Sequence, residues 1–276
     1  MNGSWHRIGT IGRNTFLEAV RQKFFSVLVI LSIALIASSR FFRQFDFGTG
    51  ELKFVADFGL GAIMLFGSIL AVVAMAQLFF SEVENRTALT ILAKPVTRWE
   101  FLTGKFLGVF ALLFVFVALM VGILALMLYW RQGDLFTPGV EDQQGRVSFG
   151  GLFGFGILQW IKLGVLCAIT LYVSSFSNTN LYSVVVSFFV MLICQLQYIA
   201  HDSWHDIENP LLRGIVWALG KVFPNFQVFN VGDVMLFPGQ AGELAASTPW
   251  QIAGYGLIYI VVLIGLAVFT FRRREI

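Results

Sequence analysis

The sequence predicts an all-α, polytopic membrane protein with six transmembrane helices, and three observations lead to this class. Hydrophobic residues make up 57% of the 276-residue chain and charged residues only 13%, whereas about a quarter of a soluble domain is charged. Six apolar runs approach or exceed the roughly 20 residues that a helix needs to cross a bilayer. The runs are continuous rather than alternating, which excludes a transmembrane β-barrel. They cover residues 24–42, 59–80, 106–128, 152–176, 181–200 and 252–271.

The distribution of Lys and Arg predicts that both termini lie in the cytoplasm, because basic residues are retained on that side of the membrane. With this orientation the cytoplasmic segments hold eleven basic and five acidic residues. The external segments hold seven basic and eleven acidic residues. The small net charge of +3 therefore reflects membrane topology, and no nucleic-acid surface is expected.

Residues 4–22, which precede the first apolar run, are expected to form an amphipathic helix in the inner membrane interface. Trp5 and Ile8 belong to a set of apolar residues that recur near helical spacing, while Arg7 and Arg13 occupy other faces. The alternative is a solvated N-terminal extension. No small-residue cleavage site follows a short apolar region, so no removable signal peptide is expected.

The segment 81–105 predicts a charged helical hairpin on the cytoplasmic side, between the second and third apolar runs. Thr97 and Glu100 fit a capping box, in which the hydroxyl and the carboxylate each accept from the other residue's backbone N–H. A helix should therefore start at Arg98. Pro95 disfavours helical geometry at the residue before it and ends the preceding helix. An ordinary cytoplasmic loop is the alternative, although such loops are more often brief and polar.

The external segment 201–251 is the loop long enough to hold its own structure. Its apolar stretches, interrupted at Pro224, are too short to span the membrane, so short or re-entrant helices on the outer face are expected. The two cysteines, Cys167 and Cys194, fall inside apolar runs and predict no disulfide or redox function.

Two histidines at the start of this segment form a weak candidate metal site. His201 and His205 are spaced to share one helix face, with Asp202 and Asp206 beside them, and such a set can bind Zn or Cu. A solvated helix end with Trp204 at the interface is the favoured interpretation, because no third ligand is clear.

Lys162 lies well inside the fourth apolar run, where a charge is costly and marks a functional candidate. Gln195 and Gln197, in the outer half of the next run, could face it across a short connection and line an outward substrate chamber. Two other interpretations stay open. Lys162 could extend to the outer surface beside Trp160, and the glutamines could serve as hydrogen-bonding contacts between helices.

Several strings in the chain resemble those of ABC-2-type permeases, the membrane subunits of one class of ATP-binding-cassette transporters. In the hairpin these are Glu84-Asn85-Arg86-Thr87, Leu92-Ala93-Lys94-Pro95-Val96-Thr97-Arg98, Glu100-Phe101 and Gly104-Lys105. Ile11-Gly12-Arg13-Asn14-Thr15-Phe16 and Phe223-Pro224-Asn225-Phe226 resemble other parts of the family. In particular, the strings resemble the subfamily that includes the permease associated with copper-site maturation of nitrous oxide reductase. Many members have Gly before the threonine, where this chain has Arg86.

The resemblance implies that the hairpin is a coupling helix seated in a cleft of a separate ATPase. It also implies a homodimer or a pair with a homologous permease, export as the direction, and a bacterial-type inner membrane. The chain has no P-loop, in which Gly, four residues and Gly-Lys-Ser/Thr would cradle phosphate. We therefore expect no cofactor in this chain, with ATP and Mg²⁺ held by the partner. The residues expected to couple are Glu84, Arg86, Thr87, Lys94, Pro95, Arg98, Glu100, Gly104 and Lys105.

Two other functions are compatible with the sequence. The first is a membrane-embedded, metal-dependent enzyme that uses His201 and His205. The second is a membrane scaffold that recruits a cytosolic protein without transport. Nothing in the sequence resembles a catalytic triad, and a transport subunit without its own ATPase site is the favoured interpretation.

Overall fold

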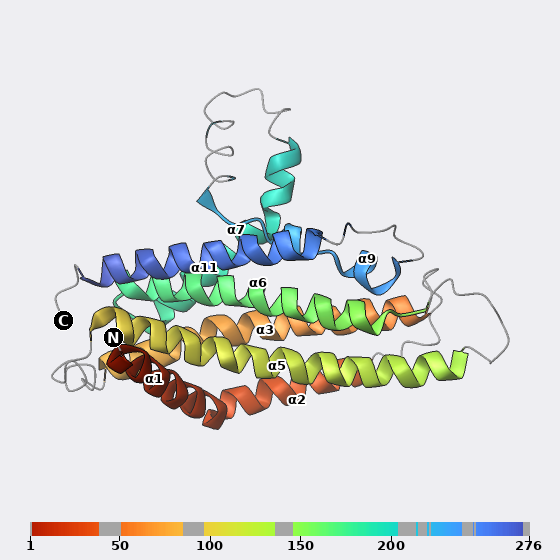
Figure 1. Ribbon diagram of the computed structural model, residues 1–276, viewed down its shortest axis with the longest axis horizontal. Helices are drawn as coiled ribbons and strands as arrows, with labels where there is room; N and C mark the ends of the chain where they lie inside the picture. The colour runs from red at the N-terminus through yellow and green to blue at the C-terminus, as the bar shows by residue number, and fades with distance from the viewer. Residues whose placement is uncertain are drawn as a thin grey trace.

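The computed structural model describes residues 2–38, 51–84, 97–135, 146–203, 214, 220, 222–238, 245 and 247–272. Every regular element within them is a helix, and the long helices lie side by side (Figure 1). The all-α class is thereby confirmed. The elements are α1 (Asn2–Arg21), α2 (Lys23–Ser38), α3 (Glu51–Glu84), α5 (Arg98–Leu135), α6 (Phe149–Phe176), α7 (Asn180–Ser203), η2 (Phe226–Phe229), α9 (Gly232–Leu236) and α11 (Thr248–Arg272).

Five of the described helices are long and apolar enough to cross a membrane: α3, α5, α6, α7 and α11. The pair α1 and α2 provides a sixth crossing if the two count as one span, with a bend of 62° between them. The bend falls where the amphipathic, charged sequence of α1 gives way to the apolar sequence of α2. A bent pair of this kind suits an interfacial helix followed by a spanning one.

The helices extend beyond the apolar runs that predicted them. α3 begins at Glu51, so residues 51–58 are helical rather than part of an external loop, and α5 continues to Leu135. The apolar runs 59–80 and 106–128 therefore understate the lengths of α3 and α5. Residues 51–57 are mostly good helix formers despite their charges, so the helical hydrogen bonds propagate past the end of the apolar run.

α6 forms the centre of the bundle and packs against α3, α5, α7 and α11. Every residue from 161 to 171 is buried. Gly164 lies so close to α5 that an added Cβ would stand 2.3 Å from the ring of Phe110. Nearby, the indole of Trp160 stacks on Phe110 at 4.2 Å between centroids and donates to its carbonyl oxygen at 2.9 Å. The α5–α6 contact is therefore close and specific.

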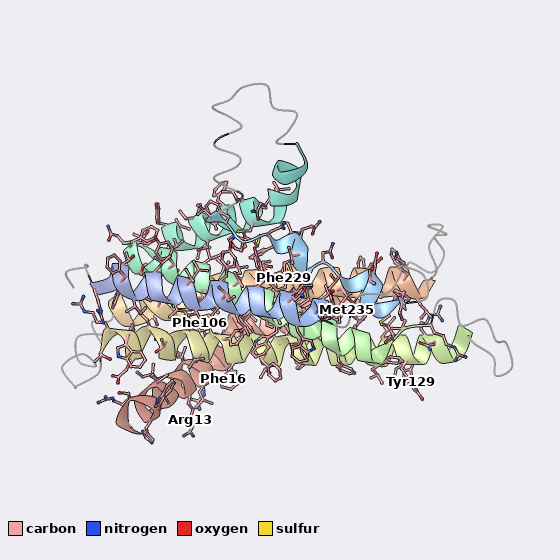
Figure 2. The ribbon with its side chains drawn as sticks, turned by 45° about the horizontal axis from the view of Figure 1, so that its top comes forward. Arg13, Phe16, Phe106, Tyr129, Phe229 and Met235 are labelled. Atoms are coloured by element: carbon pink, nitrogen blue, oxygen red, sulfur yellow. The ribbon has the colours of Figure 1, made fainter. Side chains whose placement is uncertain are left out.

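Residues 222–238, which lie in the segment 201–251 that was predicted to be external, pack short helices against α6. Asn225 caps η2 by accepting from the backbone N–H of Gln227 at 2.9 Å, directly after the helix-breaking Pro224. Figure 2 shows Phe229 and Met235 of this segment beside the bundle. A Cβ on Gly151 would stand 1.8 Å from the carbonyl oxygen of Met235, so glycine is required there. Short helices were expected in this segment, and η2 and α9 are two of them.

Candidate functional site

The start of α5 confirms the helix boundary that the capping box predicted. α5 begins at Arg98, and the carboxylate of Glu100 accepts from the backbone N–H of Thr97 at 2.9 Å. This bond supplies a partner for one of the N–H groups that the first turn of a helix leaves open. The base of the predicted hairpin is therefore a well-defined helix start.

The same carboxylate holds the N-terminal helix. Arg7 of α1 donates from Nη2 to Oε1 of Glu100 at 2.9 Å, across 93 residues of sequence. The Glu100 side chain is 1% exposed and that of Arg7 37%. Both carboxylate oxygens thus have partners, one on α1 and one at the cap of α5. A buried carboxylate with this pairing fixes α1 relative to the helix start.

Backbone contact extends the joint between α1 and α5. A Cβ on Gly104 would stand 2.7 Å from Cγ2 of Ile11, and one on Gly108 would stand 2.6 Å from the carbonyl oxygen of Gly12. Small residues let helices approach this closely. We call this contact, together with the Arg7–Glu100 ion pair, the α1–α5 junction. Lys105 is fully buried in the same turn of α5.

Arg98 connects the junction to the end of α11. Its guanidinium donates to the carbonyl oxygens of Phe271 and Arg272 at 2.9 and 3.0 Å and lies 5.8 Å from the ring centroid of Phe271. The last carbonyls of a helix lack intrahelical partners and favour a cation. α1, the start of α5 and the end of α11 consequently meet at one end of the bundle (Figure 1).

The predicted coupling residues therefore fall into two groups. Arg98, Glu100, Gly104 and Lys105 lie at the base of the hairpin and contact the rest of the chain. Direct contact with an ATPase stays a prediction for them, and the buried Glu100 and Lys105 are better placed to position the hairpin. Glu84 is the last residue of α3, but its side chain lies outside the described residues, as do Arg86, Thr87, Lys94 and Pro95.

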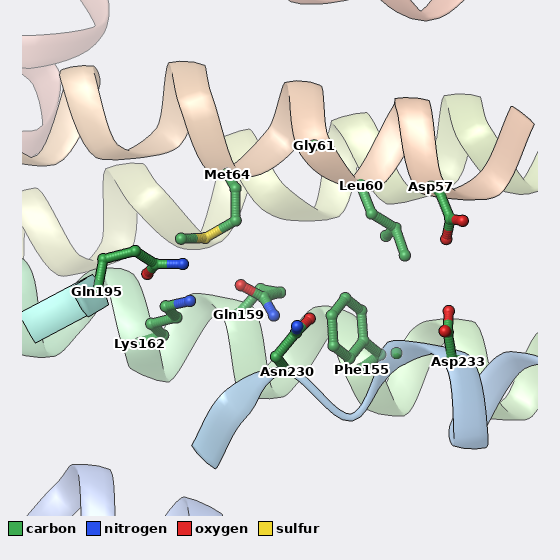
Figure 3. Close-up of a pocket in the computed structure, with 11 residues that line it drawn as sticks. Asp57, Leu60, Gly61, Met64, Phe155, Gln159, Lys162, Gln195, Asn230 and Asp233 are labelled. Atoms are coloured by element: carbon green, nitrogen blue, oxygen red, sulfur yellow. The ribbon is translucent and has the colours of Figure 1, made fainter. Parts of the chain in front are cut away.

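A second feature is a pocket of about 420 Å³ between α3, α6, α7 and the external segment. Lys162 lines it and is only 3% exposed, with its ammonium 5.5 Å from the ring centroid of Phe226. Lys162 therefore does not extend to the molecular surface, which was one interpretation of the sequence. The other residues that line the pocket are Asp57, Leu60, Gly61, Met64, Phe155, Gln159, Gln195, Asn230, Gly232 and Asp233 (Figure 3).

The two glutamines of α7 differ in position. Gln195 lines the pocket with Lys162, whereas Gln197 donates from Nε2 to the carbonyl oxygen of Gly220 at 2.6 Å. Residues two positions apart on a helix face in nearly opposite directions, so only one of the pair reaches the pocket. Of the predicted chamber, the structure brings Lys162 and Gln195 together and places Gln197 elsewhere.

The sequence reasoning missed the acidic end of the pocket. Asp57 lies on α3 just before an apolar run and Asp233 lies on α9, so the two belong to distant segments. The signal for Asp57 was its place beside a membrane span, where carboxylates are costly. Nothing local distinguishes Asp233 from other residues of the external segment.

The candidate metal site lies almost wholly outside the described residues. His201 is in the last turn of α7, and neither its side chain nor His205 is described. Among the residues that the structure does describe, no group of three or more His, Cys, Asp or Glu could hold a metal ion. Metal binding by this pair stays a prediction.

The fold and the pocket define a class: a multi-pass helical membrane protein with a polar cavity among apolar helices. Residues 10–276 match the family model described as ABC-2 family transporter protein. The chain belongs to that family and is a permease subunit of an ABC transporter, the membrane component of an assembly that also contains an ABC ATPase. A comparison with curated proteins gave no match.

Proposed function

We propose that this permease receives the force of ATP hydrolysis at segment 81–105 and transmits it along α3 to the pocket. One observation carries the proposal: α3 is a continuous helix with pocket residues Asp57, Leu60 and Met64 near its start. Its last residue, Glu84, enters the predicted hairpin. A packed helix moves as a rigid element, so a displacement of the hairpin would displace one wall of the pocket.

The α1–α5 junction also supports this mechanism, because it lies at the other end of segment 81–105, where α5 begins. Glu100 and Gly104 bind the start of α5 to α1, and Arg98 binds it to the end of α11. A push on the hairpin would then move α1, α5 and α11 together rather than bend α5 alone. Coordinated movement of several packed helices is what alternating access requires.

The assembly proposed for this mechanism contains two permeases and two copies of a separate ATPase that holds ATP and Mg²⁺. The second permease is another copy or a homologous chain. Both termini lie on the cytoplasmic side of a bacterial-type inner membrane, as the distribution of basic residues along the chain favours. The direction of transport is export. The narrower resemblance to the permease of nitrous oxide reductase maturation remains a prediction from the strings in the hairpin.

The pocket is the proposed substrate site. It lies beside Lys162, which follows the external start of α6 by about four turns, and it combines apolar walls with a few polar groups, as ligand sites do. Its volume of about 420 Å³ falls in the range of small-molecule sites.

The coupling proposal is tested by purifying the permease with the ATPase encoded by a neighbouring gene. Reversing charge at Glu84 and Arg98 (Glu84→Arg, Arg98→Glu) should abolish co-purification. Arg146→Glu, an exposed change at the start of α6, should leave it intact. Because Arg98 also binds the end of α11, the melting temperature of each variant is measured in parallel. Retained association in the double variant would contradict the proposal, and association without substrate-stimulated hydrolysis would indicate a scaffold.

A further inference from the structure

The pocket has opposite charges at its two ends. Lys162 and Gln195 lie at one end, and the carboxylates of Asp57 and Asp233 face each other at the other end (Figure 3). The apolar side chains of Leu60 and Phe155 lie between the two ends, and Met64 lies opposite Lys162 at the basic end. A site built this way has separate places for an anion, an apolar group and a cation.

The basic end favours an anionic partner. Lys162 is 3% exposed, and its ammonium lies 5.5 Å from the ring centroid of Phe226. A cation–π contact offsets only part of what the burial of an ion costs. A carboxylate or phosphate oxygen at this position would add a charge-assisted hydrogen bond that the ring cannot supply.

A glutamine beside Lys162 adds an unused polar atom. Gln159 is 3% exposed, and its Nε2 donates to the carbonyl oxygen of Phe229 at 3.4 Å. Its Oε1 is buried without a hydrogen-bond partner among the described residues. An unpaired buried acceptor is destabilising, so a ligand with an N–H group in the middle of the pocket would compensate for it.

The acidic end carries an excess of negative charge. Asp57 and Asp233 both line the pocket, and among the described residues the basic side chain paired with them is Lys53, whose Nζ lies 3.2 Å from Oδ2 of Asp233. When all three groups are ionised, two carboxylates and one ammonium leave one negative charge. That charge favours a cationic group of the ligand at this end.

Helix geometry sets the separation of the two ends. Asp57 and Met64 are two turns apart on α3, which corresponds to about 10 Å. Asp57 lies at the acidic end, and Met64 lies opposite Lys162 at the basic end (Figure 3). Fully extended chain advances 3.3–3.6 Å per residue, so three peptide residues also span about 10 Å.

We propose that the pocket binds an elongated zwitterion of tripeptide length, with its carboxylate at Lys162 and its ammonium at Asp57 and Asp233. An apolar central group would contact Leu60 and Phe155. This assignment rests on the proposed transport function, since it names the substrate class of the same pocket. An ethanolamine phospholipid carries the same two charges, but they are closer together in its headgroup.

The test measures binding of Ala-Leu-Ala to the full chain in nanodiscs of phosphatidylglycerol, a lipid without an amine. N-acetylation or C-amidation of the peptide should each weaken binding at least about tenfold, because each removes one charge. In Lys162→Met, amidation of the peptide should not weaken binding further, whereas acetylation still should. In Asp57→Asn, acetylation should not weaken binding further, whereas amidation still should. Lys23→Met and Glu18→Gln, exposed changes outside the pocket, should behave as the unmodified protein.

Three results would overturn the zwitterion assignment. These are no binding of Ala-Leu-Ala, equal binding of its blocked derivatives, and binding of phosphatidylethanolamine in preference to the peptide, which would refute the proposed length. The ATPase co-purification experiment is independent of all three. If the peptide does not bind but the ATPase still associates in a charge-dependent way, the substrate class is refuted and the coupling mechanism is retained. If the peptide binds but ATPase association does not depend on these charges, the coupling mechanism alone is refuted.

Discussion

Glu100 shows how one side chain can serve a cap and a tertiary contact at once. One oxygen accepts from the N–H of Thr97 and the other from the guanidinium of Arg7, both at 2.9 Å. Surface ion pairs contribute about 0–1 kcal/mol, whereas breaking a buried pair costs more because a charge is left without its partner. With a buried carboxylate and a partly exposed guanidinium, this pair lies between the two cases.

Arg7→Met is therefore expected to destabilise the protein by about 1–3 kcal/mol, because Glu100 would keep its buried charge without the guanidinium. Arg13→Met is the matched control on the same helix, since Arg13 is exposed and lies on the side away from α5 (Figure 2). The measurement is the thermal unfolding midpoint of each purified variant in detergent. Equal midpoints for the two variants would show that the Arg7–Glu100 pair contributes nothing to stability.

At the scale of elements, the α1–α5 junction depends on glycine for the close approach of its two helices. Gly104→Ala would place a Cβ 2.7 Å from Cγ2 and 2.8 Å from Cβ of Ile11, which the β-branched side chain cannot avoid by a simple rotation. Gly122, further along α5, has no atom within 4 Å of the position of an added Cβ. Gly104 and Gly122 thus both lie in α5, but only Gly104 is in close contact with another helix.

Gly104→Ala is expected to lower stability by about 1–3 kcal/mol through overpacking, despite the better helix propensity of Ala. Gly122→Ala should leave stability unchanged or raise it slightly, because the higher helix propensity of Ala is the one effect expected there. The unfolding midpoints of both variants check this. If α1 moves with the hairpin, Gly104→Ala should also reduce ATPase stimulation in the assembled transporter while Gly122→Ala does not. A midpoint for Gly104→Ala equal to that for Gly122→Ala would contradict the close contact.

The elements also show which parts of the structure a sequence can predict. Apolar runs predicted the middle of each spanning helix, and the local pattern Thr97 to Glu100 predicted the start of α5. The ends of α3 and α5 were missed because charged residues continue a helix once its hydrogen bonds are in place. The Arg7–Glu100 pair and the acidic end of the pocket were missed because they join segments that only the tertiary fold brings together.

For the whole molecule, the proposed mechanism links two functional regions at opposite ends of the long helices. α5 has 38 residues, or about 57 Å of helix, which exceeds the roughly 30 Å hydrocarbon core of a bilayer. Its start at Arg98 precedes the apolar run 106–128 by eight residues, or about 12 Å of helix. The pocket is near the other end of α3, next to the external segment.

This arrangement makes the orientation in the membrane a decisive test, because an ATPase can act only on the cytoplasmic end. Both native cysteines are fully buried, so single new cysteines can be labelled without removing them. Arg146→Cys should react with a membrane-impermeant maleimide in intact cells. Thr97→Cys, exposed at the start of α5, should react only after the membrane is permeabilised. The opposite pattern would place the hairpin outside, where no ATP is available, and would exclude coupling through it.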